Sequence, residues 1–133
     1  PLTELSGTST DGKYFTATGW SPDGSRLAGI LQTDSGRPAG AAVYDLAAKK
    51  TTMVSGDVTF AVKWLPDGRR VMYFTTDGRE LVMVDTTTRA RTVVDVRLPA
   101  PATNEVFAIS RDGRTIYYGA ARAEADIWIV ERK

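Results

Sequence analysis

The chain of 133 residues contains no cysteine and no histidine. Without cysteine it can form no disulfide bond, no thiolate metal site and no thiol nucleophile. Without histidine it can build neither a Ser-His-Asp nor a Cys-His triad, and no zinc or iron site with histidine ligands. Catalysis would depend on carboxylates, lysine, serine, threonine or tyrosine, and no constellation of these stands out from the sequence. We therefore expect a protein without enzymatic activity.

The sequence also lacks an excess of charge of one sign, because 17 lysines and arginines face 16 acidic residues. This balance, and the lack of an aromatic strip for base stacking, argue against a nucleic-acid partner. No apolar run approaches the ~20 residues that a membrane-spanning helix needs. Phosphate-binding loops, dinucleotide fingerprints and EF-hand spacing are missing too, so we expect no cofactor and no metal.

The sequence does contain a pentapeptide that occurs three times. Its copies begin at Trp20, Trp64 and Ile109, and they read Trp-Ser-Pro-Asp-Gly, Trp-Leu-Pro-Asp-Gly and Ile-Ser-Arg-Asp-Gly. The copies are 44 and 45 residues apart, a period typical of propeller blades and solenoids. We therefore interpret residues 1–133 as one domain with repeats at about 14–55, 59–95 and 105–130, preceded by an outer strand at residues 2–6.

Each copy has the composition of a type I turn that closes a β-hairpin. Proline presets φ at the second position, and the final glycine adopts the left-handed conformation from which the chain re-enters a strand. Because the acidic residue recurs with the turn, we assign it to turn formation and not to catalysis. The residues with this structural role are Pro22, Asp23, Gly24, Pro66, Asp67, Gly68, Asp112 and Gly113.

Apolar strand-like segments flank every turn, and no segment has a helical period. Strands at this spacing indicate an all-β fold. Residues 81–84 and 127–130 are apolar at consecutive positions, which indicates sheets covered on both faces. Small antiparallel sheets stacked around an axis satisfy this demand. The sequence therefore predicts a β-propeller with three four-stranded antiparallel blades, in which Trp20 and Trp64 pack between neighbouring blades.

Three blades cannot close a ring, since propellers have ~4–8. The chain begins with a segment typical of a fourth strand, at residues 2–6, and its last repeat has no fourth strand. This offset predicts strand exchange, in which residues 2–6 pair beside residues 126–130 of another molecule or segment. We expect the partner to be a second copy of the chain, or a missing half of a longer polypeptide.

The turn sequence, the apolar strand after it and the later Asp-bearing turn resemble the repeats of TolB-type propellers, also called WD-like repeats. The resemblance covers nearly the whole chain, although the third copy departs from it at Ile109 and Arg111. This family includes periplasmic interaction proteins and propeller domains attached to peptidases, lyases and receptor-like kinases. The resemblance implies a non-catalytic binding module for proteins or peptides, in an extracytoplasmic or periplasmic location. The alternative is an accessory propeller domain of a larger hydrolase, lyase or receptor-like kinase.

Arginine recurs in the loops that follow the second strand of each repeat. Asp-Gly alone would make these turns, so we interpret Arg37, Arg79 and Arg122 as candidate binding residues that form an arc at the mouth of the propeller channel. Guanidinium groups suit carboxylates, including a peptide C-terminus. In the alternative interpretation each arginine pairs locally, with Asp34, Asp77 or Glu124, and only keeps its loop soluble.

Overall fold

The computed structural model describes residue 5 and residues 8–120, in which eleven β-strands and no helix occur. The strands are β1 Ser9–Thr10, β2 Lys13–Trp20, β3 Arg26–Gln32, β4 Pro38–Asp45, β5 Lys50–Ser55, β6 Lys63–Trp64, β7 Arg70–Phe74, β8 Leu81–Asp85, β9 Arg91–Val93, β10 Ala102–Ile109 and β11 Ile116–Ala120. Among these residues no helix is long and apolar enough to cross a membrane. The predicted all-β fold class is confirmed.

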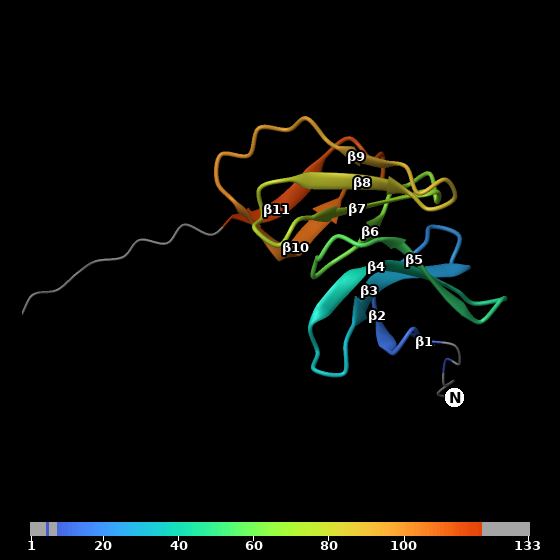
Figure 1. The fold of residues 1–133 in the computed structure, drawn as a ribbon. Coiled ribbons are helices and arrows are strands. Elements are labelled where there is room, and N and C mark those ends of the chain that lie inside the picture. Colours follow the sequence, from blue (N-terminus) through green and yellow to red (C-terminus); the bar gives the residue numbers. More distant parts are fainter. Residues whose placement is uncertain (1–4, 6–7, 121–133) are drawn as a thin grey trace, which may run out of the picture.

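The strands form three antiparallel sheets that follow one another along the chain (Figure 1). The first sheet contains β1 to β5, the second β6 to β9 and the third β10 and β11, each in sequential order. Sequential antiparallel order is the arrangement of a propeller blade. Within the described residues only the second sheet has the four strands expected of every blade. The predicted strands at residues 2–6 and 126–130 lie, apart from Leu5, outside the described residues.

The first sheet has five strands where the repeat predicts four. A tight turn with positive φ at Asp11 and Gly12 brings β1 against the start of β2, and β1 also contacts β5 at the opposite edge. The sheet therefore curls. The Phe15 ring lies over Gly29 inside the curl and stacks on Tyr44, with ring centroids 6.0 Å apart. Curling lets this sheet bury apolar side chains on the face that no other described sheet covers.

In the second sheet the first strand is shorter than the sequence predicts. Only Lys63 and Trp64 pair with β7, although the strand-like segment before this turn begins at Thr59, the start of the predicted repeat. The preceding segment is fixed by side chains instead. Thr59 Oγ1 donates to Phe74 O at 2.8 Å, and Thr18 Oγ1 contacts both Val62 O and Val62 N, at 2.8 and 3.0 Å. These side-chain bonds satisfy backbone N–H and C=O groups that would otherwise pair between strands of the sheet.

Two apolar layers hold the sheets together. The layer between the first and second sheets contains Ile30 and Val43 on one side and Trp64, Val71 and Val84 on the other. The layer between the second and third sheets is centred on Phe74, whose ring lies 5.3 Å from that of Phe107 and 5.7 Å from that of Tyr118. The stacking of sheets face to face explains why residues 81–84 are apolar on both faces.

The two tryptophans of the repeat differ in burial. Trp64 is only 7% exposed and packs between the first two sheets, as the sequence predicts. Trp20 is 63% exposed, so the described residues do not provide the packing between blades that the sequence predicts for it. The reason is positional: a described sheet precedes Trp64, and none precedes Trp20.

Candidate functional site

Each of the three Asp-Gly pairs lies in a tight hairpin turn. The N–H of Gly24 donates to Ser21 O, that of Gly68 to Leu65 O and that of Gly113 to Ser110 O, at distances of 2.9 to 3.0 Å. All three glycines have φ between 64° and 72°, the left-handed region that glycine adopts without strain. The turns connect β2 to β3, β6 to β7 and β10 to β11.

The aspartates of these turns are occupied by local hydrogen bonds. Asp23 accepts from Ser21 Oγ at 2.6 Å and from the N–H and hydroxyl of Ser25, and these bonds lower its pKa to about 2. The Ser110 hydroxyl likewise lowers the pKa of Asp112. A carboxylate held in this way stays ionised at neutral pH, and a general acid or base needs a pKa near the working pH. The bonds of Asp23 and Asp112 lie within their own turns, as a role in closing the hairpins requires.

Successive turns pack against one another across the sheets. Pro22 lies over Gly68, and Pro66 lies over Gly113, where an added Cβ would come within 3.2 Å of the proline ring. The guanidinium of Arg26 stacks on Trp64, 4.6 Å from the ring centroid, and donates to Gly68 O at 2.5 Å. The turn of one sheet therefore packs against the turn of the next sheet, and in the first pair a hydrogen bond also joins them.

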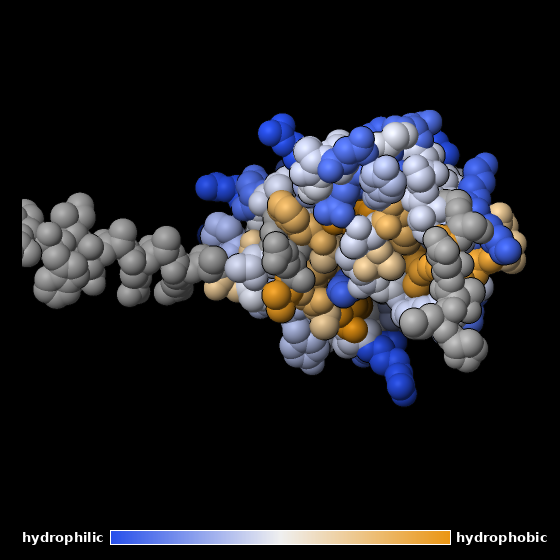
Figure 2. Space-filling view, turned by 90° about the horizontal axis from the view of Figure 1, so that it is seen from below, coloured by the Kyte–Doolittle hydropathy of each residue, from blue (hydrophilic) through white to orange (hydrophobic). Residues whose placement is uncertain are grey.

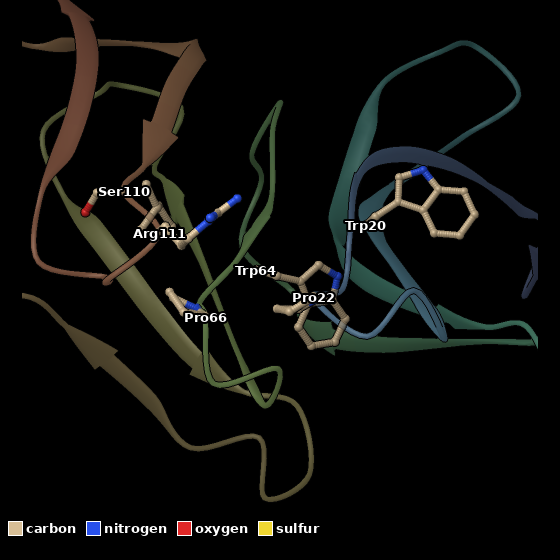
Figure 3. A pocket seen from close by; sticks show the side chains of 7 residues that line it. Trp20, Pro22, Trp64, Pro66, Ser110 and Arg111 are labelled. Carbon is tan, nitrogen blue, oxygen red and sulfur yellow. The ribbon is translucent and has the colours of Figure 1, made fainter.

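A groove of about 430 Å³ runs along these turns (Figure 3). It is lined by Trp20, Pro22, Trp64, Pro66, Ile109, Ser110 and Arg111. In the close-up Pro22 lies against Trp64, whereas the Trp20 ring stands apart from the other labelled side chains. The groove joins equivalent positions of the three repeats, so its apolar lining follows directly from the recurrence of the pentapeptide.

The candidate arginines lie in loops at the other end of the same hairpins. Arg37 ends the turn between β3 and β4, where the N–H of Thr33 donates to Arg37 O at 2.9 Å. Arg79 has the equivalent place between β7 and β8, and both side chains are exposed. The two loops lie on the same side of the molecule, at the left of Figure 1. Arg122 lies outside the described residues.

Neither described arginine makes the local ion pair of the alternative interpretation. The ion pairs found among the described residues include neither Arg37 nor Arg79. The carboxylate of Asp77 accepts from the Thr75 hydroxyl at 2.7 Å and from the backbone N–H of Arg79 at 3.1 Å. These two bonds, in that order, lower the pKa of Asp77, and the positive charge of Arg79 lowers it further without a direct ion pair. The Arg79 guanidinium is therefore not needed to satisfy Asp77.

A polar cluster that the sequence does not reveal lies between the first and second sheets. Asp57 Oδ2 accepts from Tyr73 Oη at 2.7 Å and from Arg91 Nε at 2.6 Å, and Ser55 Oγ lies 2.9 Å from the same tyrosine oxygen. Partial burial raises the pKa of Asp57, but the hydrogen bonds from Arg91 and Tyr73 outweigh it and keep this pKa low. The repeat gives no signal here, since Lys13 stands one period before Asp57.

Burial also raises the pKa of Tyr73 well above its usual range, which leaves the phenol neutral. In this cluster the neutral phenol of Tyr73 therefore donates a hydrogen bond to the ionised carboxylate of Asp57. Neither group is poised for proton transfer near neutral pH. Among the described residues no group of three or more acidic side chains forms a metal site.

Comparison with known proteins identifies similar folds but no sequence family. No family model matches the chain, and no curated protein matches its sequence. Among solved structures, TolB from Acinetobacter baumannii is similar with a TM-score of 0.62 and 20% identity, over 84% of this chain and 27% of that chain. The putative TolB from Agrobacterium tumefaciens gives a TM-score of 0.54 and 15% identity, over 82% of this chain and 50% of that one.

A third similar structure is a hydrazine synthase from Kuenenia stuttgartiensis. Its TM-score is 0.55 and its identity 19%, over 79% of this chain and 29% of that chain. The chain thus spans half or less of each of these similar structures. At such identities the comparison concerns the fold alone. The described part of this chain has a propeller-like all-β fold, structurally similar to TolB and other β-propeller proteins.

Proposed function

We propose that this protein is a non-catalytic β-propeller module that binds a protein or peptide ligand through a carboxylate. The observation that supports this most directly is that Arg37 and Arg79 are exposed and form no direct ion pair among the described residues, while the turns around them are closed by other groups. A loop arginine that neither closes its turn nor pairs locally is available to a ligand. Function in rigid scaffolds is commonly carried by such loops.

The surroundings of Arg79 indicate the chemistry of that ligand. Arg79 lines a groove of about 380 Å³ between its own loop and the segment that precedes β10. The other lining residues are Val96, Arg97, Leu98, Pro99, Ala100 and Pro101. Two guanidinium groups beside apolar side chains suit a peptide that carries a carboxylate next to an apolar residue. We propose Arg122 as a third member of this arginine set.

Three sheets are fewer than the ~4–8 blades of a closed propeller. We propose that further sheets complete it, supplied by a second copy of the chain or by the remainder of a longer polypeptide, with strand exchange between residues 2–6 and 126–130. We also propose an extracytoplasmic or periplasmic location, on the basis of the resemblance to TolB-type repeats. A hydrazine synthase contains a similar fold within a longer chain. That observation favours, as a second candidate, an accessory propeller domain of a larger enzyme.

The carboxylate proposal is tested with fluorescent peptides that end in an apolar residue followed by glutamate. One set has a free C-terminus and the matched set an amide with glutamine in place of glutamate. We expect anisotropy titrations to show binding of the free set only. The double variant Arg37→Ala, Arg79→Ala should weaken it about tenfold or more, because a hydrogen bond to a charged group contributes roughly 1.5 kcal/mol or more.

A matched control removes two positive charges from the opposite loops of the same sheets. Lys49 and Arg89 both have positive φ, 51° and 61°, and asparagine tolerates this conformation. The double variant Lys49→Asn, Arg89→Asn should therefore keep both fold and affinity. Equal binding of the two peptide sets, or an equal loss of affinity in the two double variants, would contradict the proposal.

A further inference from the structure

Trp20 and Trp64 occupy equivalent positions of the repeat, at the ends of β2 and β6. Trp20 pairs with Leu27 across its hairpin, and Trp64 pairs with Val71 in the same register. The two indoles nevertheless differ widely, being 63% and 7% exposed. An exposed tryptophan at a position that is buried one repeat later indicates a contact that the described residues do not complete.

The chain itself shows what covers such a tryptophan. The preceding sheet places the Arg26 guanidinium over the Trp64 ring, 4.6 Å from its centroid, and anchors that guanidinium on Gly68 O at 2.5 Å. The same sheet places Pro22 against Trp64 (Figure 3). The cover therefore consists of a Pro-Asp-Gly turn and an arginine two residues after its glycine.

The contact between the second and third sheets lacks the tryptophan, and its arginine is placed differently. In the third sheet Ile109 replaces tryptophan. Arg70, the counterpart of Arg26, then turns back to Asp67 in its own turn, at 2.5 Å. The proline contact between the two sheets is kept, since Pro66 of the second sheet lies over Gly113 of the third. In the two contacts described, Arg26 extends to the next sheet, where a tryptophan stands, and Arg70 pairs within its own turn, where the next sheet has isoleucine.

Trp20 lies at the end of the stack of sheets. Figure 2 shows that apolar residues gather on the side of the molecule where the first sheet lies. The curled strand β1 contacts β2 and β5, and the Trp20 ring at the other end of β2 is left exposed. What remains open is therefore the turn end of the sheet, the place where Trp64 receives its partner.

We propose that Trp20 is a docking site for one further β-sheet of the same repeat type, which covers the indole with a Pro-Asp-Gly turn and an arginine two residues beyond it. This deepens the proposed closure of the propeller and rests on it. A second copy of this chain does not supply this cover with its third sheet. That sheet carries Arg111 at the proline position and Thr115 at the arginine position. The partner sheet has the chemistry of the first sheet.

The test uses a chain that carries the required sheet. Residues 19–62 are duplicated in tandem, so that residues 1–62 are followed by residues 19–133, an insertion of one period of 44 residues. The second-copy Trp20 then follows Val62, as Lys63 and Trp64 do now, and faces Pro22 and Arg26 of the first copy. The indole N–H signals are followed by NMR and assigned with Trp20→Phe in either copy. A soluble nitroxide broadens the signals of exposed indoles, so the broadening of each signal measures the exposure of that tryptophan.

We expect the second-copy Trp20 to become as protected as Trp64, while the first-copy Trp20 remains broadened as in the parental chain. Arg26→Ala in the first copy should restore broadening of the second-copy Trp20. The same substitution in the second copy is the matched control: that arginine faces Trp64, so the second-copy Trp20 should stay protected. Repeat proteins gain stability from each added interface, so the tandem chain should also unfold at a higher denaturant concentration.

Three results would overturn the proposal. One is equal broadening of the two Trp20 copies. Another is a tandem chain that is less stable than the parental chain or does not fold. The last is a parental chain that forms a dimer in light scattering with Trp20 protected, which would identify a second copy as the occupant. The peptide experiment can fail without affecting these results, because Arg37 and Arg79 take no part in them.

Discussion

Replacing Asp57 with alanine should destabilise the fold more than its position in a connecting segment suggests. Asp57 Oδ2 accepts from the hydroxyl of buried Tyr73 at 2.7 Å and from Arg91 Nε at 2.6 Å. A hydrogen bond to a charged acceptor contributes roughly 1.5–3 kcal/mol. The ion pair adds only about 0.2–1 kcal/mol, because the side chains of Arg91 and Asp57 are 40% and 29% exposed.

The phenol keeps one neighbour in the variant, since Ser55 Oγ lies 2.9 Å from Tyr73 Oη. We therefore expect a loss of about 2–3 kcal/mol in the free energy of unfolding. In a domain of this size this corresponds to a decrease of roughly 10 °C in Tm. Urea unfolding followed by circular dichroism measures the loss, and Glu80→Ala is the control. Glu80 is 52% exposed and 3.8 Å from Arg91, so its removal should change stability by less than about 0.5 kcal/mol.

The Asp57 contribution should depend on pH in a defined direction. The folded-state pKa of Asp57 lies below its usual value, so the unfolded state binds the proton more readily. The stabilisation is then complete above the unfolded-state pKa of about 3.9 and is lost as the pH falls through the folded-state pKa. Wild type and Asp57→Ala should converge in stability in acid. An equal difference at pH 7 and in acid, or no difference at pH 7, would refute the assignment.

Two further predictions concern the turns. Gly36 and Gly78 both have positive φ, 75° and 67°, but a Cβ on Gly36 meets nothing, whereas one on Gly78 would lie 2.0 Å from Ala102 O. Gly36→Ala should therefore cost about 1 kcal/mol for backbone strain, and Gly78→Ala about 3 kcal/mol or more because overpacking adds to it. Equal urea midpoints would contradict this contact. The carboxyl carbon of Asp23 should titrate by NMR near pH 2, and Ser21→Ala should raise that pKa, since the Ser21 hydroxyl is the main cause of the shift. An unchanged titration in Ser21→Ala would show that other groups hold the carboxylate.

The candidate site was predictable only where it depends on sequence spacing. The period places Arg37 and Arg79 in equivalent loops, and both are exposed there. The sequence left open whether they pair with Asp34 and Asp77, because a side chain's partner depends on the conformation of the loop. In the structure the backbone and Thr75 satisfy Asp77. Asp57, Tyr73 and Arg91 are distant in the sequence, and no local pattern relates them.

The sequence by itself determined the hairpins and their stacking. Turn chemistry acts within about five residues, so the Asp-Gly turns follow from composition. Apolar residues on both faces of β8 require sheets on both sides, whatever those sheets are. Tertiary structure alone decided the fifth strand of the first sheet, the short β6 and the opposite fates of Trp20 and Trp64. Two tryptophans with the same local sequence have the same turn, but burial depends on what lies beyond the ring. Within the described part of the chain, only Trp64 has a sheet there, and that sheet supplies Pro22 and Arg26.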